Sequence, residues 1–401
     1  MKLYKAGESH GEAMVGILTG VPSGIAVDNN KIASTLAERK NAYGRSVRQQ
    51  AETDETLVTG VIGGLTIGNN VAFVIKNTVR AVCVKDDETP CEQNNCGQSD
   101  CEQNHSMQNG KGGLKPLKNL RPGHADLAGM VKFGFSDARA VAEGSSARNT
   151  CLDVAAGEVA LSMLDALDIK VTAFVRSLGL VKDETVYDFE RVSHVTAPFF
   201  STDEEYQKKF KNEVDRIKKS GDSVGGTIEI RVKNIKAGFG GYTAENRING
   251  AIARDLMSIQ AVKDIKFGLK NASECSGTDY ADKLSFAEHR VLTSCSGGID
   301  GGMTNGAEIV ITVGVKPIPT TAKGVTSVDI YGNECISSRE RADTTAVFAL
   351  CPVLKAKIAL TLCDAITKSL GDENMKDIIE RYNKRVLLQA SVYERGKCQT
   401  T

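Results

Sequence analysis

The chain contains no tryptophan, and aromatic residues make up only 5% of its 401 positions. Proteins that hold single-stranded nucleic acid usually stack its bases on aromatic side chains. Neither charge is in excess, because 50 lysines and arginines equal 50 aspartates and glutamates. Without net positive charge, a protein does not attract a phosphate backbone or an anionic membrane over long distances. We therefore expect no nucleic-acid or membrane partner, and an anionic ligand requires a local cluster of basic side chains.

Long apolar runs and targeting signals are also missing. No stretch approaches the roughly 20 apolar residues that cross a bilayer, and residues 1–5 (MKLYK) do not begin a secretory signal. The eleven cysteines are odd in number, which argues against a secreted disulfide framework. These features predict a cytoplasmic protein with reduced thiols. Neither a P-loop nor a G-x-G-x-x-G motif follows a predicted strand, so neither common nucleotide-binding loop is expected.

Hydrophobic periodicity predicts both strands and helices. Strands are expected at residues 14–20, 25–27, 56–60, 71–76, 170–175, 226–232 and 309–315. Helices are expected at about 30–41, 145–164, 203–219, 244–260, 344–369 and 375–388, with Pro352 as a kink or break. Because strands outnumber clear β-α-β units, the pattern favours an α+β fold over a doubly wound sheet.

Residues 80–119 differ from the rest of the chain. They are polar and contain a near-duplication, CEQNN at 91–95 and CEQNH at 101–105. We interpret them as a flexible insertion within a single domain that covers residues 1–401. Cys91, Cys96, Cys101 and His105 could gather zinc, but their spacing is not that of a usual zinc knuckle, so no metal is expected.

Ser296–Thr320 reads SGGIDGGMTNGAEIVITVGVKPIPT and places five glycines ahead of an apolar strand. Glycines let a ligand lie against the backbone, whose N–H groups suit a phosphate or a polar ring edge. The same glycines are also consistent with a simple hairpin turn.

Two of the five histidines lie next to glycine at sharp turns, in GESHG (7–11) and RPGHAD (121–126). Such positions suit contact with a ligand, although a surface turn is the alternative. The serines of SSARNT (145–150) are either ordinary helix caps or an anion site. RAD (341–343) is either functional or an ion pair with a cap. Two imidazoles, several arginines and hydroxyls together suggest proton transfer on an anionic substrate without a covalent nucleophile.

The order and spacing of these motifs resemble the chorismate synthase family over nearly the whole chain. The matching segments are GESHG, RPGHADLAG (121–129), SSARNT, GGIDGGMTNG (297–306), KPIPT (316–320) and RAD. The resemblance implies helices layered between antiparallel sheets, a homotetramer, and the 1,4-anti elimination of phosphate from 5-enolpyruvylshikimate 3-phosphate. This step of aromatic amino-acid biosynthesis gives chorismate and requires reduced FMN. NADPH is one candidate reductant, and the sequence leaves open whether the chain reduces its own flavin.

The resemblance also implies roles for individual residues. His10 would protonate or stabilise the departing phosphate, His124 would protonate the reduced flavin, and Asp343 would act with the flavin N5 in removal of the ring proton. Ser9 and Ser146 would orient these groups. Substrate contacts are expected from Arg39, Arg45, Arg121 and Arg148. Flavin contacts are expected from Ser145, Ser146, Gln260, Ala261, Gly301, Lys316, Pro317, Ile318, Pro319, Thr320 and Arg341.

The chain departs from the family pattern at three positions. Gly144 stands where arginine is common before the two serines, Ala51 replaces a basic residue, and Val79 replaces an aspartate. Loss of one charged hydrogen bond costs about 1.5–3 kcal/mol. A catalytically weakened paralogue that binds flavin or substrate is therefore one alternative, and an NAD(P)H:flavin oxidoreductase is another.

Overall fold

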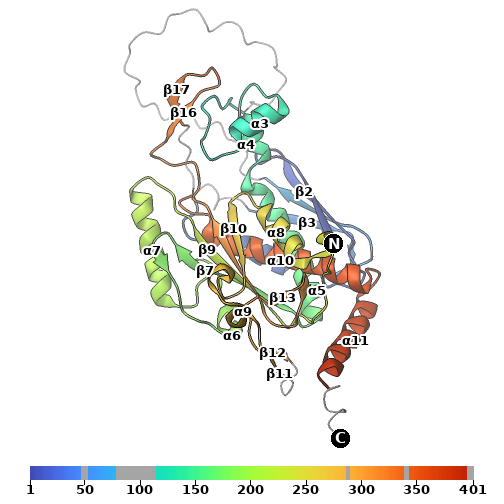
Figure 1. Cartoon of the computed structure of the whole chain (residues 1–401). Coiled ribbons are helices and arrows are strands. Elements are labelled where there is room, and N and C mark those ends of the chain that lie inside the picture. Colours follow the sequence, from blue (N-terminus) through green and yellow to red (C-terminus); the bar gives the residue numbers. More distant parts are fainter. Residues whose placement is uncertain (47–52, 78–113, 286–289, 338–342, 395–401) are drawn as a thin grey trace, which may run out of the picture.

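The computed structural model describes residues 1–46, 53–77, 114–285, 290–337 and 343–394. Two antiparallel sheets enclose a layer of helices (Figure 1), which confirms the α+β prediction. The first sheet has the order β1-β2-β6-β3, formed by β1 (Lys2–Ala6), β2 (Ala13–Thr19), β6 (Val71–Lys76) and β3 (Thr56–Thr59). The second has the order β10-β15-β9-β7-β8, formed by β10 (Val262–Phe267), β15 (Ile309–Val315), β9 (Gly226–Lys233), β7 (Lys170–Leu178) and β8 (Val181–Lys182).

The helical layer consists of α1 (Asn29–Asn41), α5 (Thr150–Ala166), α8 (Ile248–Met257) and α10 (Val347–Leu370). Helix α5 packs against β1, β2 and β6 of the first sheet, whereas α10 packs against β7 and β9 of the second. The two helices also pack against each other. Because both lie between sheets, each buries most of its surface, which explains why neither sequence shows a distinct polar face.

Gly157 lets α5 and α10 approach closely. A Cβ atom at this position would lie 2.2 Å from the Cβ of Ala356 on α10. This is far inside van der Waals contact, so the interface admits only glycine without a shift of the helices.

The remaining elements surround this sandwich. Longer helices are α3 (Asp126–Phe133), α7 (Glu204–Lys219) and α11 (Met375–Glu394), and shorter ones are α4 (Arg139–Gly144), α6 (Phe189–Ser193) and α9 (Gly277–Tyr280). Two-stranded hairpins are β4 (Val61–Ile62) with β5 (Leu65–Thr66), β11 (Leu284–Ser285) with β12 (Arg290–Val291), β13 (Ile299–Asp300) with β14 (Met303–Thr304), and β16 (Thr326–Val328) with β17 (Glu334–Ile336). Among the described helices, none combines the length and the apolarity needed to span a bilayer.

Several predicted boundaries are wrong. Residues 25–27 form no strand, and Ala26 makes only an isolated bridge to Leu65. Helix α5 begins at Thr150 rather than Ser145, because Ser146 caps a 3₁₀ turn that precedes it. Helix α8 likewise begins at Ile248, after a separate 3₁₀ turn at Ala244–Asn246.

Pro352 does not break α10, which is continuous from Val347 to Leu370. The predicted insertion of residues 80–119 is too long at its C-terminal end, since Leu117 is buried and Asn119 bridges to Asp329. Most of the predicted insertion, including Cys91, Cys96, Cys101 and His105, lies outside the described residues. The six cysteines that the structure describes are all free thiols.

Candidate active site

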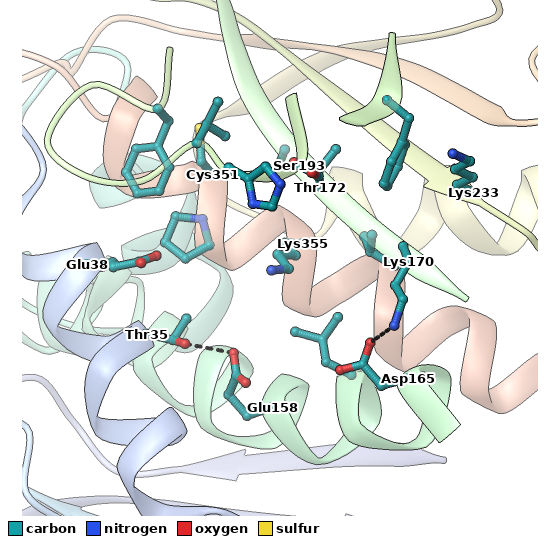
Figure 2. A pocket seen from close by; sticks show the side chains of 18 of the residues that line it. Thr35, Glu38, Glu158, Asp165, Lys170, Thr172, Ser193, Lys233, Cys351 and Lys355 are labelled. Atoms are coloured by element: carbon teal, nitrogen blue, oxygen red, sulfur yellow. Dashed lines mark hydrogen bonds and ion pairs between the residues drawn. The ribbon is translucent and has the colours of Figure 1, made fainter. Parts of the chain in front are cut away.

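Within the described residues, four cavities are large enough for a small molecule, with volumes of about 600, 360, 330 and 310 Å³. The largest, about 600 Å³, is lined by residues of α1, α5, α6, β7 and α10 (Figure 2). It contains the Thr35–Glu158 hydrogen bond and the Lys170–Asp165 ion pair, but no described residue of the predicted site. A second cavity, about 330 Å³, is lined by nearly all of them. All four volumes lie within the range typical of ligand pockets, so side-chain chemistry rather than size identifies the candidate site.

His10 is held in the second cavity by Glu143. It lies in the connection between β1 and β2, where Gly7 has a φ of 108° and the chain reverses tightly. The ring Nδ1 lies 2.7 Å from Glu143 Oε1, and the backbone N–H of His10 donates to Oε2 over 3.0 Å. Ser9 Oγ donates to the same Oε2 over 2.7 Å. Backbone, ring and neighbouring hydroxyl therefore converge on one carboxylate.

Glu143 is ionised in this environment. The side chain is only 8% exposed, and burial by itself would raise the pKa. The hydrogen bonds from His10 and Ser9 outweigh burial and lower the pKa of Glu143 below its ordinary value.

His124 is held by a second carboxylate, Asp126. Its Nδ1 lies 2.8 Å from Asp126 Oδ1, and Asp126 is 1% exposed. Arg121 donates to Asp126 through its backbone N–H and through Nε and Nη2, at 3.0, 2.9 and 2.8 Å. Burial would raise the pKa of Asp126, but the hydrogen bonds from Arg121 and His124 lower it far below the usual range. The motif RPGHAD is thus a rigid turn closed by its own ion pair.

The RPGHAD turn lies against the KPIPT segment. Lys316 Nζ donates to the carbonyl of Gly123 over 2.8 Å, and a Cβ at Gly123 would lie 3.2 Å from Pro319 Cβ. Gly123 also has a φ of 78°, which favours glycine. Gly123 and Lys316 are 193 residues apart in the sequence. Their two motifs nevertheless form adjoining parts of one cavity wall.

Arg39 and Arg148 also line the cavity. Arg39 of α1 donates to Thr150 Oγ1 and to the carbonyl of Ala147, both over 3.1 Å. Arg148 forms a buried ion pair with Asp54. Because Arg39 donates to neutral oxygens, its charge is not offset there, whereas that of Arg148 is.

Asp343 lies at the start of the segment that leads into α10. Arg45 Nη1 donates to Oδ2 over 2.9 Å, and the backbone N–H of Ser46 donates to Oδ1 over 2.7 Å. These contacts place a buried carboxylate, 7% exposed, on the wall of the same cavity.

The cavity as a whole is electropositive although the chain is neutral. Its lining includes six arginines and lysines but only three carboxylates, in addition to the two histidines. Burial, followed by the charge of Lys263, lowers the pKa of Lys316. Apolar surface comes from residues such as Ala261, Pro317 and Ile318. Such a pocket suits a ligand that combines a flat apolar part with several anionic groups.

Most predicted site residues lie together in this cavity. They are Ser9, His10, Arg39, Arg45, Arg121, His124, Ser145, Ser146, Arg148, Gln260, Ala261, Lys316, Pro317, Ile318, Pro319, Thr320 and Asp343. Arg341, Ala51 and Val79 lie outside the described residues.

Gly301 is not among the residues that line this cavity in the single chain, and its predicted flavin contact stays a prediction. The glycine-rich loop packs against residues 239–248. The carbonyl of Gly302 accepts from Gly241 and Ile248, and Thr304 donates to the carbonyl of Phe239. A Cβ at Gly302 would lie 2.5 Å from the carbonyl oxygen of Gly241. Close backbone packing therefore accounts for Gly302, whereas a Cβ at Gly301 would meet only the end of the Met303 side chain, at 3.9 Å.

Sequence reasoning missed Glu143 and did not assign Asn77 or Thr150. Asn77 accepts a hydrogen bond from Arg148 Nε over 2.9 Å and donates to the carbonyls of Glu8 and Gly11. Glu143 is the only charged residue in the segment AVAEG (140–144). A single charge among uncharged residues is the sequence feature that could have identified it as a site residue.

Three comparisons place the chain among known proteins. The family model described as chorismate synthase matches residues 1–367. A chorismate synthase of Desulforamulus reducens is 33% identical over 96% of this chain and 98% of the relative. One from Bifidobacterium longum is 36% identical over 94% and 95%, respectively. A solved crystal structure of chorismate synthase has a TM-score of 0.73 and 27% identity, and the match covers 97% of this chain and 98% of that one.

Proposed function

The chain belongs to the chorismate synthase family, and we propose that the cavity around His10 and His124 is its catalytic centre. The family eliminates phosphate from 5-enolpyruvylshikimate 3-phosphate to give chorismate, and it requires a reduced flavin. The observation that carries the proposal is the convergence of both carboxylate-bound imidazoles on one electropositive cavity.

The residues present fit a flavin, and we propose FMN. Lys316 to Thr320, Gln260 and Ala261 line the cavity with backbone polar groups and apolar surface, and Ser145 and Ser146 lie beside them. Gln260 Nε2 reaches the carbonyls of both serines over 3.4 Å, and Lys316 donates its backbone N–H to Ala261. When bound, the reduced flavin would lend electron density to the substrate as phosphate leaves and would recover it as the ring proton is removed.

The chain's own residues would move and hold the protons. His10 gives a proton to the departing phosphate oxygen, and His124 presents a proton toward the flavin. Asp343, fixed by Arg45 and Ser46, acts in removal of the ring proton. Ser9 orients His10 through their shared partner Glu143, and Ser146 caps the turn that carries Arg148.

The substrate carries two carboxylates and a phosphate, so it requires several cationic partners. We propose that Arg39 and Arg45, with Arg121 and Arg148, supply them. Arg39 makes the strongest candidate because it donates only to neutral oxygens in its described contacts. The other three form ion pairs, Arg45 with Asp343, Arg121 with Asp126 and Arg148 with Asp54.

A binding experiment tests this assignment. Oxidised FMN is titrated into the protein with and without 5-enolpyruvylshikimate 3-phosphate while the flavin spectrum is followed. We expect a saturable spectral change that becomes tighter with the ester, because both ligands share one cavity. Lack of any FMN binding, or displacement of FMN by the ester, would contradict the proposal. Adding NADPH to the complex then asks whether the chain reduces its own flavin.

A further inference from the structure

The two imidazoles of the cavity are each hydrogen-bonded through Nδ1 to a buried carboxylate, but the two arrangements differ. We propose that Glu143 is a positioning residue for the reaction: it keeps a proton on Nδ1 of His10 and so assigns Nε2 to proton transfer. The inference deepens the proposed function and rests on the assignment of His10 as the acid. It is carried by the donors that surround the Glu143 carboxylate.

Donor and acceptor chemistry determines where the proton of His10 lies. An ionised carboxylate only accepts hydrogen bonds, so Nδ1 must be the donor across the 2.7 Å contact with Glu143. Ser9 Oγ lies 3.2 Å from Nδ1, but its single hydrogen is already donated to Glu143 Oε2 over 2.7 Å. The ionised carboxylate of Glu143 therefore favours the Nδ1–H form of His10.

The surroundings of His124 do not fix its proton in the same way. Its Nδ1 faces both Asp126 Oδ1, at 2.8 Å, and Arg121 Nη2, at 3.1 Å. Arginine is a donor and aspartate an acceptor, so the two neighbours favour opposite tautomers. Asp126 also shares its charge with the Arg121 guanidinium, whereas the guanidinium recorded beside Glu143, that of Arg139, lies 3.8 Å away. The negative charge of Glu143 is therefore less neutralised by arginine than that of Asp126, and it interacts more strongly with His10.

The proton balance of the elimination follows from this tautomer. The C–O bond breaks and its electron pair leaves with the phosphate, which takes the Nε2 proton of the His10 imidazolium. His10 is left neutral with its remaining proton on Nδ1, still held by Glu143. The proton lost from the substrate ring is taken elsewhere in the cavity, so each turnover transfers one proton to phosphate and removes one from carbon. His10 must regain a proton at Nε2 before the next cycle.

The tautomer is testable without any catalytic activity. Long-range ¹H–¹⁵N NMR of the full chain, labelled at histidine, distinguishes Nδ1–H from Nε2–H imidazoles, and His10→Gln assigns the signal. We expect neutral His10 to be in the Nδ1–H form, and Glu143→Ala to shift it toward Nε2–H. Asp126→Asn should change His124 and leave the His10 signal in place. An unchanged His10 tautomer in Glu143→Ala would overturn the proposal.

Kinetics provide the second arm. In Glu143→Ala, kcat should fall about 100-fold, within the 10²–10⁴ range of general acid catalysis, while KM changes less than about threefold. Glu143→Gln retains an acceptor for Nδ1–H, so it should keep the tautomer and recover part of kcat. If the alanine variant does not fold, the glutamine variant is measured in its place. Glu204→Gln, on the exposed start of α7, is the matched control and should retain full activity. A wild-type kcat in Glu143→Ala would overturn the proposal, whereas an inactive wild type with the expected tautomer would instead overturn the proposed function.

Discussion

His10 and Glu143 show how far single residues could be predicted from sequence. His10 stands out because glycines flank it at the end of a short strand, and His124 because it follows Pro-Gly. Glu143 has no such local mark, and 133 residues separate it from His10. Glu143 contacts His10 only because α4 packs beside the β1–β2 connection in the folded chain. Residues at turns can be recognised from their neighbours in the sequence. The partner that determines where a side chain carries its proton is set by tertiary packing.

Replacing Asp126 should cost stability at neutral pH. Asp126→Asn leaves the Arg121 guanidinium, 6% exposed, without its buried counter-charge, and breaking such a pair costs about 3–5 kcal/mol. The pKa of Asp126 is lowered on folding, so its contribution is present above the unfolded pKa near 4 and is lost as pH falls through the lower folded value. Urea unfolding at pH 7 and below pH 4 measures both effects.

We expect the deficit of Asp126→Asn to be largest at pH 7 and to shrink on acidification. Asp188→Asn is the control, because Asp188 is an exposed helix cap and asparagine caps equally well. An equal deficit at both pH values would contradict the ion-pair explanation.

Gly144 can accept the arginine that the family pattern leads one to expect. A Cβ at this position meets nothing within 4 Å, and the neighbouring Ser145 lines the cavity. In Gly144→Arg the added cation should tighten binding of the phosphate ester about tenfold, which corresponds to one charged hydrogen bond of about 1.5 kcal/mol. Isothermal titration of the ester, with Gly144→Gln as a neutral control of similar length, measures this. Equal affinities in the two variants would show that the position does not reach the anion.

At the scale of elements, periodicity identified the long helices and the central strands. The apolar sequence of α10 predicted a buried helix, and alternation in 226–232 predicted β9 within one residue of its end. Boundaries failed where a side-chain cap or a 3₁₀ turn interrupts the pattern, as at the start of α5. The hairpins with two or three residues in each strand were not predicted, because so short a strand shows no periodicity.

The contact between α5 and α10 yields a prediction of its own. Alanine is about 1 kcal/mol better than glycine in a helix, yet Gly157→Ala would place its Cβ 2.2 Å from that of Ala356. Overpacking of this kind costs about 1–3 kcal/mol and should outweigh the gain. We expect a net loss of stability in urea unfolding. Gly144→Ala, where the new methyl group has space, should be neutral or stabilising. A more stable Gly157→Ala would show that the helices separate easily.

At the scale of the whole molecule, the outer face of the first sheet is apolar and exposed. Tyr4, Ile17 and Leu57 are 61%, 42% and 61% exposed, and Tyr4 and Ile17 are directly paired across β1 and β2. Exposed apolar patches commonly mark interfaces. This face is therefore our candidate subunit contact in the homotetramer that the family resemblance implies. The contact could not be predicted from the sequence, because the pattern of apolar residues does not show which of them stay exposed in the folded chain.

The assembly can be tested by light scattering after size-exclusion chromatography. We expect a tetramer for the native chain and smaller species for Ile17→Lys, because a buried charge at a subunit contact is unfavourable. Leu180→Lys changes an apolar residue of the β7–β8 turn that is 86% exposed, and this variant should remain tetrameric. A tetrameric Ile17→Lys would place the contact on another face.

The central claim about the molecule is that His10 and His124 act in one cavity on one reaction. The decisive measurement is anaerobic release of phosphate from 5-enolpyruvylshikimate 3-phosphate with chemically reduced FMN, for the native chain and for His10→Ala and His124→Ala. We predict that the native chain releases phosphate and chorismate in equal amounts, and that each variant is at least about 100-fold slower. No phosphate release by the native chain, or native rates in both variants, would contradict the account.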